Sequence, residues 1–506
     1  MDEKIGGKRA DTLSRIVNEN KWAFLSALAF GLAAHMFAFT NKLMNADEVE
    51  SLFGKGATVT SGRWGLEWVK LVFHDFSMPW LYGIISLILL AFSACLIIRL
   101  FEIRGHLMQM LLAGMLTAFP AQTGVFCFMF TSSAYALSFI MAVLAVWLSL
   151  RHGWKGTAAG LVLLTLSLSI YQAYIAAAAS LFVLWLVKGC LDGREVKSLV
   201  LCGFKSLALM VAALALYYGI TLLVLRLTGA EFNTYVTGNV NAISLPRKIR
   251  MAYDFFYYTF SYREFAYLSG PFSRLLHLVC LALCALALLW ESFRMLRARR
   301  APAAALMLLL CAVLPLAINC MFLVMAKESI HSLVLYSFVA VYVLAALLCE
   351  RVMQGGCISA KLSRDIVYFS LAAVLVSNVF FANQCYLKMH LQYENAYSFY
   401  TILLSRVQNT PGYEPDTEIA LIGHYDNKLY TFPQFDLGYL KGPGQDLINI
   451  YSRENFLRRY MGLELPLADA EEIERLSRTE EFADMAEYPY YGSVAMIDGC
   501  AVVKLG

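Results

Sequence analysis

Residues 157–187 read TAAGLVLLTLSLSIYQAYIAAAASLFVLWLV, a stretch of about 30 residues without a charged side chain. A helix needs about 20 apolar residues to cross the hydrocarbon core, so a single helix of this length would overshoot the bilayer. The polar pair Tyr171-Gln172 lies near the middle of the stretch. We therefore predict two short spanning helices that meet there. This division sets the number of crossings, and with it the side of the membrane on which each loop lies.

The rest of the chain up to residue 383 follows the same pattern. Of its 506 residues, 59% are apolar and 15% are charged, whereas soluble proteins carry about 25% charged residues. This composition excludes a soluble enzyme, a disordered chain and a small disulfide scaffold. Nine further apolar blocks bring the predicted crossings to about eleven: 22–40, 79–101, 107–130, 133–150, 200–227, 272–293, 302–325, 331–349 and 365–383. The sequence thus predicts a polytopic α-helical membrane protein.

Charge is segregated along the chain. Residues 384–506 carry 18 acidic and 10 basic side chains, a net charge of −8, while the whole chain carries +4; the first 383 residues therefore carry +12. With eleven crossings, the basic clusters of the short loops all fall on one face. The positive-inside rule makes that face, with the N-terminus, cytoplasmic and places the C-terminal segment outside. The outer loop 228–271 also carries four basic residues, which we accept because long loops obey the rule less strictly.

Polar sequence is concentrated on the predicted outer face. It lies in the loops 41–78 and 228–271 and in the C-terminal residues 384–506. We therefore divide the chain into a membrane domain, 1–383, and a small outer domain, 384–506. The inner loops are all short, and none of them has room for a nucleotide-binding domain.

The outer domain is predicted to be α+β. It begins with an amphipathic helical stretch, 386–407, and has a charged helix near 468–487. Two strand-like runs, 418–423 and 493–505, lie beside turns rich in Pro and Gly. Cys385 and Cys500 both fall in this domain, and their spacing leaves open whether the two sulfurs meet.

Asp47 and Glu48 follow the first predicted span, 22–40, by about two helical turns. An ionised carboxylate within hydrocarbon costs at least about 2.5 kcal/mol, so this pair is expected at the outer interface. A carboxylate at that place can accept a proton from an attacking hydroxyl. The alternative is a solvated acidic start of a loop, which is the commoner origin of such a pair.

The same loop contains Ser61-Gly62-Arg63-Trp64 and, one turn later, Trp68. Tryptophans anchor at the headgroup level of a membrane, and an arginine there can bind a phosphate with two parallel hydrogen bonds. Arg63 is therefore a candidate phosphate ligand. The alternative is an arginine whose charge only reaches the lipid headgroups.

Further polar groups lie at predicted membrane ends. Gln172, beside Tyr171, occupies the turn between the two short helices, and Asn319 lies within a late span. Lys327 and His331 occupy a very short outer turn. Such groups often line a cavity, but hydrogen bonding between helices explains many of them. Both interpretations stay open.

Motifs of other functional classes are absent or weak. The sequence holds no Walker A, GxGxxG, HExxH or paired CxxC motif, and no cluster compels a metal site. No basic stripe interleaved with aromatic residues occurs in a soluble region, so nucleic-acid binding has no support.

Taken in order, several short motifs resemble a known family. They are Asp47-Glu48, SGRW at 61–64, LSLSIYQ at 166–172, HSLVLY at 331–336, and Asn383, Tyr386, Tyr393-Glu394 and Tyr397-Ser398. Together they resemble the serotype-converting (Gtr-type) O-antigen glucosyltransferases of bacterial inner membranes. These enzymes belong to the broader C-type (GT-C) class of transferases that use polyprenyl-phosphate sugars.

The resemblance implies a reaction, partners and residue roles. The donor would be a sugar on undecaprenyl phosphate, and the acceptor a hydroxyl of a lipid-linked glycan on the periplasmic side. Asp47, with Glu48 as its competitor, would be the catalytic base in an inverting transfer. Arg63, Lys327 and His331 would hold the donor phosphate, with Tyr171 and Gln172 in the sugar pocket. An upstream donor synthase and a flippase would supply the substrate, and some members of the class need a divalent metal.

Three other functions remain from the sequence alone. A transporter or flippase of a lipid-linked sugar would have a similar number of spans, although matched broken helices are common in such proteins and only one candidate is seen. An O-antigen polymerase would join glycan to glycan. A structural membrane scaffold would leave Asp47 and Arg63 without a role.

Overall fold

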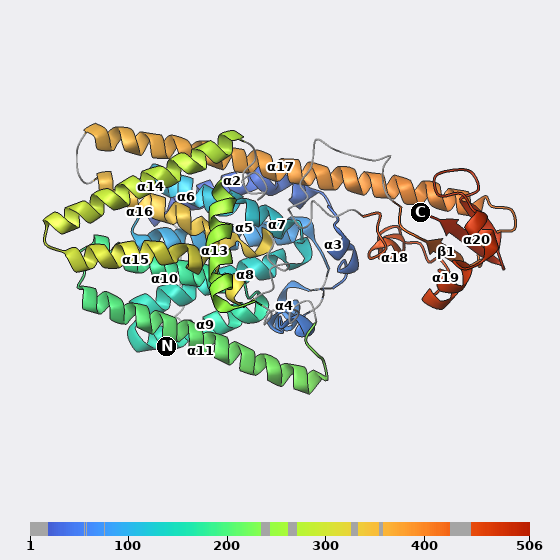
Figure 1. Cartoon of the computed structure of the whole chain (residues 1–506), viewed down its shortest axis with the longest axis horizontal. Helices are drawn as coiled ribbons and strands as arrows, with labels where there is room; N and C mark the ends of the chain where they lie inside the picture. Colours follow the sequence, from blue (N-terminus) through green and yellow to red (C-terminus); the bar gives the residue numbers. More distant parts are fainter. Residues whose placement is uncertain are drawn as a thin grey trace, which may run out of the picture.

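The computed structural model describes residues 19–54, 56, 58–74, 76–233, 243–261, 271–324, 332–353, 358–425 and 447–506. Within them, nine helices are long and apolar enough to cross a membrane. These helices are α2 (Lys21–Thr40), α5 (Pro79–Phe101), α8 (Met129–Arg151), α9 (Gly153–Ile170), α10 (Tyr174–Leu191), α11 (Val196–Thr228), α14 (Pro271–Arg297), α15 (Ala301–Ile318) and α17 (Ile358–Gln408). The chain is a polytopic α-helical membrane protein, as predicted (Figure 1).

Two predicted crossings are occupied by shorter helices. The block 107–130 forms α6 (His106–Ala118) and α7 (Pro120–Phe126). Phe119 between them is extended, because a residue before proline is disfavoured in the helical region. The block 331–349 forms the 3-10 turns η5 (Ser332–Val334) and η6 (Tyr336–Val339), followed by α16 (Ala340–Met353). A further 3-10 turn, η3 (Cys320–Leu323), follows α15.

The predicted division of 157–187 is confirmed, since α9 ends at Ile170 and α10 begins at Tyr174. Tyr171 has an extended backbone there. Just before the break, the buried Ser167 hydroxyl donates to the carbonyl of Ser138 at 2.8 Å, and the Ser138 hydroxyl donates to the carbonyl of Ser167 at 2.9 Å. These reciprocal bonds fix α9 against α8 and so hold the break in place.

Basic loops meet at one end of the helix bundle. Glu102, after α5, accepts from Arg151 at 3.1 Å and from Lys188 at 3.2 Å. Arg300, before α15, donates to the carbonyl of Cys190 at 2.9 Å. The ends of α5, α8 and α10 and the start of α15 therefore lie together, as the predicted threading requires.

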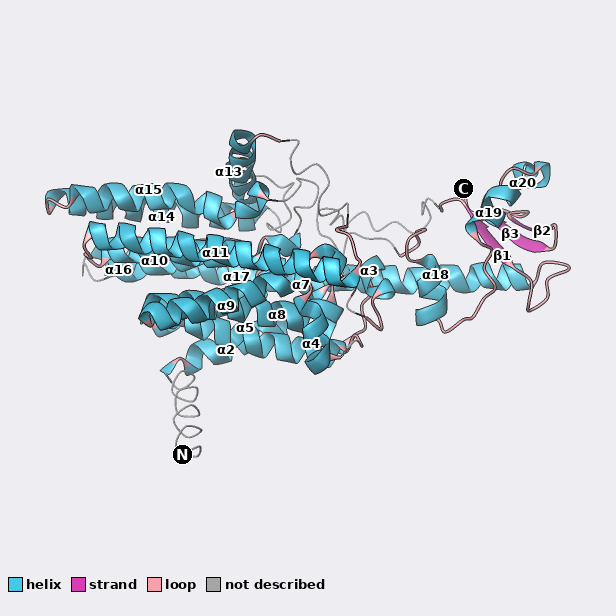
Figure 2. Ribbon diagram, turned by 90° about the horizontal axis from the view of Figure 1, so that it is seen from below, coloured by secondary structure: helices cyan, strands magenta, loops and turns pink. Residues whose placement is uncertain are grey.

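The opposite end carries short helices of the two loops predicted to lie outside, and it faces the C-terminal residues (Figures 1 and 2). The first of these loops, 41–78, forms α3 (Ala46–Glu50), the 3-10 turn η1 (Val59–Ser61) and α4 (Gly65–Phe73). The second forms α13 (Leu245–Ser261), which Figure 2 shows running across the direction of the spanning helices.

The last helix, α17, leads out of the bundle. Its 51 residues correspond to a length of about 77 Å, and it extends past the other helices toward the C-terminus (Figure 2). It passes residue 383 without a break, so the last span and the first helix of the predicted outer domain are one helix. The division into 1–383 and 384–506 stays a prediction. We call residues 384–506 the C-terminal unit.

The C-terminal unit ends in a three-stranded sheet of order β1-β3-β2. β1 pairs in parallel with β3 (Ile419 opposite Ala501), and β2 pairs antiparallel with β3 (Val494 opposite Val503). Its elements are β1 (Ile419–Ile422), α18 (Arg453–Asn455), the π-helical turn η8 (Phe456–Tyr460), α19 (Ala470–Leu476), α20 (Glu480–Asp484), β2 (Val494–Ile497) and β3 (Cys500–Lys504). Both predicted strand runs are present, and the charged segment forms two short helices.

Two questions left by the sequence are resolved by packing. Cys385 and Cys500 are separate buried free thiols. Asn319 is buried, and its side-chain amide donates to the carbonyl of Ala252 on α13 at 2.9 Å. Its amide group thus fixes the outer-loop helix to the end of α15.

Candidate active site

The helix α3 is fixed to the bundle at its first residues. Asn45 caps it, because its side chain accepts from the backbone N–H of Glu48 at 2.9 Å, as residues before a helix commonly do. The same side-chain amide donates to the carbonyl of Cys127, between α7 and α8. The position of the Asp47-Glu48 pair is therefore set by the start of α8.

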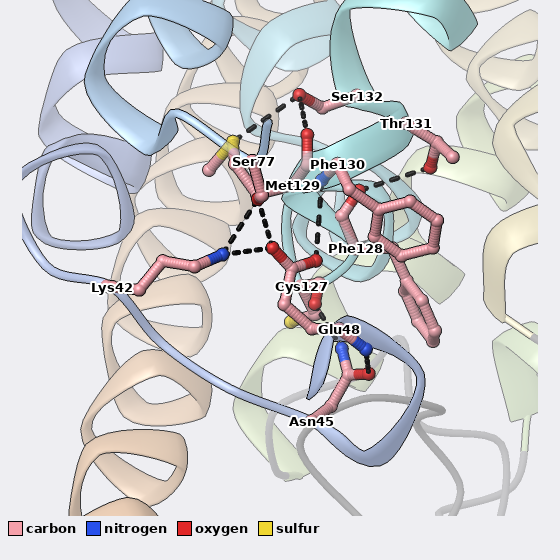
Figure 3. Close-up of polar contacts among 10 residues, drawn as sticks. All are labelled: Lys42, Asn45, Glu48, Ser77, Cys127, Phe128, Met129, Phe130, Thr131 and Ser132. Atoms are coloured by element: carbon pink, nitrogen blue, oxygen red, sulfur yellow. Dashed lines mark hydrogen bonds and ion pairs between the residues drawn. The ribbon is translucent and has the colours of Figure 1, made fainter. Parts of the chain in front are cut away.

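Glu48 is fully buried, and both of its carboxylate oxygens are occupied (Figure 3). Oε1 accepts from the Lys42 ammonium and the Ser77 hydroxyl, and these two groups are joined by a bond of 2.7 Å. Oε2 accepts from the backbone N–H of Phe130 at 3.3 Å. That N–H lies in the first turn of α8, where helix amides lack helical partners and favour a negative charge. Glu48 thus joins three segments of the chain.

Replacing Glu48 by Gln is expected to destabilise the protein. The ammonium of Lys42 would lose its charged partner, and breaking a buried ion pair costs about 3–5 kcal/mol; because Lys42 is partly exposed, we expect about 3 kcal/mol. The unfolding temperature in detergent measures this loss. Glu67→Gln on α4 is the control for loss of a partly exposed ion pair, because Glu67 pairs with Lys70; it is expected to cost about 1 kcal/mol or less. An unchanged unfolding temperature for Glu48→Gln would contradict the structural role.

Asp47 has different surroundings, although it is the next residue. It is half-buried, and its negative charge, after partial burial of the phenol, helps to raise the pKa of Tyr451 in the C-terminal unit to about 12. The carboxylates of Asp47 and Glu48 therefore point to different parts of the protein. Glu48 faces the bundle, whereas Asp47 faces the C-terminal unit and is partly exposed.

Arg63 lies against two stacked tyrosines. Its guanidinium donates to the hydroxyl of Tyr135 at 3.0 Å, and its central carbon lies 6.0 Å from the Tyr135 ring and 5.4 Å from the Tyr171 ring. The two rings stack with their centroids 4.0 Å apart. A cation over such rings is stabilised by about 0.5–2 kcal/mol. The guanidinium is thereby held in one place near the start of α8.

Gln172 joins the break between α9 and α10 to the same loop. Its amide donates to the carbonyl of Ser61 at 3.0 Å and to the hydroxyl of Tyr217 at 2.9 Å. Tyr217, on α11, in turn donates to the carbonyl of Gly62 at 3.0 Å. Gly62 has φ of +70°, and a Cβ there would lie 2.6 Å from the Tyr217 oxygen. Glycine suits this turn, because another side chain would be strained at this φ and would displace the Tyr217 hydroxyl; the turn presents Arg63 to the tyrosines.

The two parts of the site are linked through α8. Glu48 binds the N–H of Phe130, and Arg63 binds Tyr135, which follows Phe130 by five residues. This separation is about 7.5 Å along a helix axis. The acidic pair and the arginine therefore lie at the same end of the bundle, on successive turns of one helix.

With this geometry established, similarity to known proteins identifies the family. A family model described as glucosyl transferase GtrII matches residues 36–344, more than half of the chain. The chain belongs to the GtrII glucosyl transferase family. The resemblance seen in the sequence is thus confirmed. No curated protein and no solved structure shows significant similarity to this chain.

The part of this GtrII-family glucosyltransferase that matches begins within α2 and ends within α16. It includes both acidic residues, the SGRW loop and the break between α9 and α10. The C-terminal unit lies outside it. Membership in the family makes the protein a glucosyltransferase, but it assigns no role to individual residues.

The structure brings together part of the residue set predicted for the glucosyltransferase. Arg63, Tyr171 and Gln172 share one network. Lys327 and His331 lie outside the described residues. Two contributors, Tyr135 and Tyr217, were missed, because each is one of several aromatic residues in an apolar span. A tyrosine near a membrane interface is common, and the sequence does not show which loop it contacts.

The described residues contain no cluster that could bind a metal ion. Among them, no three or more His, Cys, Asp or Glu side chains gather in a way that could hold an ion. Within this part of the chain there is no ligand set for the divalent metal that some class members need, so no step proposed below is routed through one.

Proposed function

We propose that this glucosyltransferase moves glucose from undecaprenyl-phosphate-glucose to a lipid-linked O-antigen or another surface glycan. The reaction would take place on the periplasmic side of the bacterial inner membrane and invert the configuration at the anomeric carbon. The observation that carries this proposal is the half-buried Asp47 at the same bundle end as Arg63, the two parts joined by α8. A base and a fixed cation near each other suit transfer of a sugar from a phosphate leaving group.

Asp47 is the proposed base. Both oxygens of its neighbour Glu48 are already occupied within the bundle, whereas Asp47 is partly exposed. In the proposed step the acceptor hydroxyl gives its proton to Asp47, and its oxygen forms a bond to the anomeric carbon. The bond from that carbon to the phosphate oxygen breaks, and its electron pair leaves with the polyprenyl phosphate. Attack from the face opposite the leaving group inverts the carbon.

Arg63 is the proposed ligand of the donor phosphate. A fixed guanidinium stabilises the charge that develops on the leaving phosphate without rearranging during the reaction. Tyr171 and Gln172, which contact Arg63 and its loop, are proposed for the sugar pocket. Lys327 and His331, outside the described residues, remain proposed further ligands of the phosphate.

The arrangement of residues at the bundle end that carries Arg63 suits a lipid-linked donor. The helix α4 follows Arg63 directly and exposes Trp68, Leu71 and Val72. Apolar and tryptophan side chains of this kind lie at the headgroup boundary of a bilayer. The lipid chain of the donor can therefore stay in hydrocarbon while its phosphosugar reaches the bundle end.

A transfer assay tests the proposal. Purified protein in proteoliposomes is mixed with polyprenyl-phosphate glucose and a lipid-linked glycan, and radiolabelled glucose on the glycan is measured. Transfer with release of polyprenyl phosphate is the expected result. Movement of the donor across the bilayer without transfer would point to a transporter, and growth of the glycan without any glucose donor would point to a polymerase.

The proposed orientation predicts which residues reagents can reach from outside. Glu480→Cys, on the exposed start of α20, is expected to react with a membrane-impermeant maleimide in intact spheroplasts. Lys197→Cys, at the opposite bundle end after α10, is expected to react only after lysis. Labelling is followed by a gel shift, and the reverse pattern would invert the orientation.

A further inference from the structure

A buried tryptophan at the basic end of the bundle is surrounded by three cations. Trp185, on α10, is 4% exposed. The guanidinium carbons of Arg194 and Arg151 lie 4.7 and 5.1 Å from the centre of its ring, and the ammonium of Lys188 lies 5.9 Å away. A cation at the face of an indole is stabilised by about 0.5–2 kcal/mol. The three cations also repel one another, so the cluster needs negative charge nearby.

Two carboxylates supply part of that charge. Lys188 pairs with Glu102 at 3.2 Å and with Asp192 at 2.5 Å. Arg151 shares Glu102, at 3.1 Å. Arg194 has its contact with the tryptophan ring, but within the described residues no carboxylate pairs with it. The cluster therefore keeps a positive charge that its own acidic residues leave unbalanced.

The way in which α10 ends explains why Arg194 lies over the tryptophan. Gly193 has φ of +83°, and the backbone N–H groups of Gly193 and Arg194 donate to the carbonyls of Cys190 at 3.3 Å and Gly189 at 3.0 Å. This is the Schellman ending of a helix, which needs a left-handed residue that is usually glycine. The side chain of Arg194 then folds back along the helix, with Cδ 3.5 Å from the place of a Cβ at Gly189.

A second arginine lies beside the same turn. Arg300, before α15, donates to the carbonyl of Cys190 at 2.9 Å. Its guanidinium lies 3.5 Å from the place that a Cβ would take at Gly193. Arg300 also lacks a carboxylate partner in the part of the chain that the structure describes, and the exposed Glu195 pairs with neither arginine there. Two guanidinium groups without a carboxylate thus flank one helix ending.

The surroundings place these arginines at the headgroup level of a bilayer. Trp154, at the start of α9 and three residues after Arg151, is 77% exposed, and tryptophan is enriched at the membrane interface. On α11, which begins two residues after Arg194, Leu201 and Phe204 are 54% and 66% exposed. Exposed apolar side chains of a spanning helix face the hydrocarbon. A ligand at Arg194 can therefore be charged at one end and apolar along α11.

We propose that Arg194 and Arg300 bind the phosphate of an anionic phospholipid at this end of the bundle. A guanidinium presents its donors in a fork that fits phosphate oxygens. Basic pockets between spanning helices bind anionic headgroups in this way on the cytoplasmic side of membrane proteins, and this end is the one predicted to be cytoplasmic. The bound lipid would balance the charge of the cluster and join the ends of α10 and α15. The family match assigns no lipid to these residues, and the site does not depend on the proposed reaction.

Lipid titration of the full-length protein tests the site. The protein, purified in an uncharged detergent at low salt, is titrated with phosphatidylglycerol, and native mass spectrometry measures the bound lipid. The double variant Arg194→Gln with Arg300→Gln is expected to bind about 10-fold more weakly, because charged hydrogen bonds to the phosphate are lost. Arg297→Gln, an exposed arginine at the same bundle end, is the matched control and should bind like wild type.

The unfolding temperature is the second readout and separates the sources of the phosphate. Phosphatidylglycerol is expected to raise it in wild type, because a ligand of the folded state stabilises that state. An equal rise with zwitterionic phosphatidylcholine would overturn recognition of the charge. An equal rise with inorganic phosphate at the same concentration would assign the site to a free anion and overturn the lipid.

The variants decide whether these two arginines form the site. Binding of phosphatidylglycerol by the double variant with wild-type affinity would overturn the proposal. If the double variant does not fold, Arg194→Lys takes its place, because it keeps the charge without the fork of donors. This variant should bind phosphatidylglycerol several-fold more weakly than wild type, and unchanged binding would overturn the role of the guanidinium.

Discussion

Asp47→Asn is expected to lower kcat for glucose transfer about 10²–10⁴-fold, the usual contribution of a general base. The amide keeps the size of the side chain, but it cannot take the acceptor's proton. KM for the donor should change little, because the donor phosphate is assigned to Arg63. Initial rates in the proteoliposome transfer assay, at saturating donor and glycan, measure the effect.

Two controls make this result specific. Glu67→Gln removes another carboxylate of the same outer loop and should retain transfer. Glu48→Gln is expected to be less stable than wild type. Its transfer rate is therefore compared with that of wild type at a temperature where the two proteins have the same folded fraction. A folded but inactive Glu48→Gln beside a fully active Asp47→Asn would move the base to Glu48 and falsify our assignment.

The contrast between Asp47 and Glu48 shows what the sequence leaves undecided. Their adjacency predicts a shared place at the outer interface, and α3, which carries both residues, lies at the bundle end that faces the C-terminal unit (Figure 1). Which carboxylate turns into the bundle depends on partners distant in sequence, because Ser77 and Phe130 bind Glu48. Composition and spacing give no information about these contacts.

The spanning helices are predictable for a different reason. Most apolar blocks form one helix that is long enough to satisfy its own backbone within the bilayer, so span length identifies them. The blocks 107–130 and 331–349, which form shorter helices and 3-10 turns, are the exceptions. The break after Ile170 also has a local signal, because polar side chains interrupt an overlong block. The continuity of α17 beyond residue 383 had no such signal. The sequence becomes more polar after residue 383, which marks the end of the apolar segment. The helix α17 itself continues until Gln408.

Arg63→Ala is expected to lower kcat about 10²–10³-fold, the loss typical of removing one preorganised group that stabilises developing charge. The leaving phosphate would then carry its charge without the guanidinium that Tyr135 and Tyr171 hold in place. Arg63→Lys keeps the charge but not the planar pair of donors, so it should recover only part of the rate. Single-turnover transfer from polyprenyl-phosphate glucose measures the chemical step.

A second role for Arg63 predicts a different pattern. If the side chain only anchored the loop to lipid headgroups, Arg63→Lys would transfer glucose at the full rate. The loss of rate in Arg63→Ala would then depend on the lipid composition of the vesicles. Arg250→Gln, a highly exposed arginine of α13, controls for general loss of positive charge at the outer end.

Because Tyr135 binds Arg63 through a single hydroxyl, Tyr135→Phe should lower the rate less than Arg63→Ala does. An equal or larger loss would mean that the tyrosine, and not the cation it holds, contacts the donor.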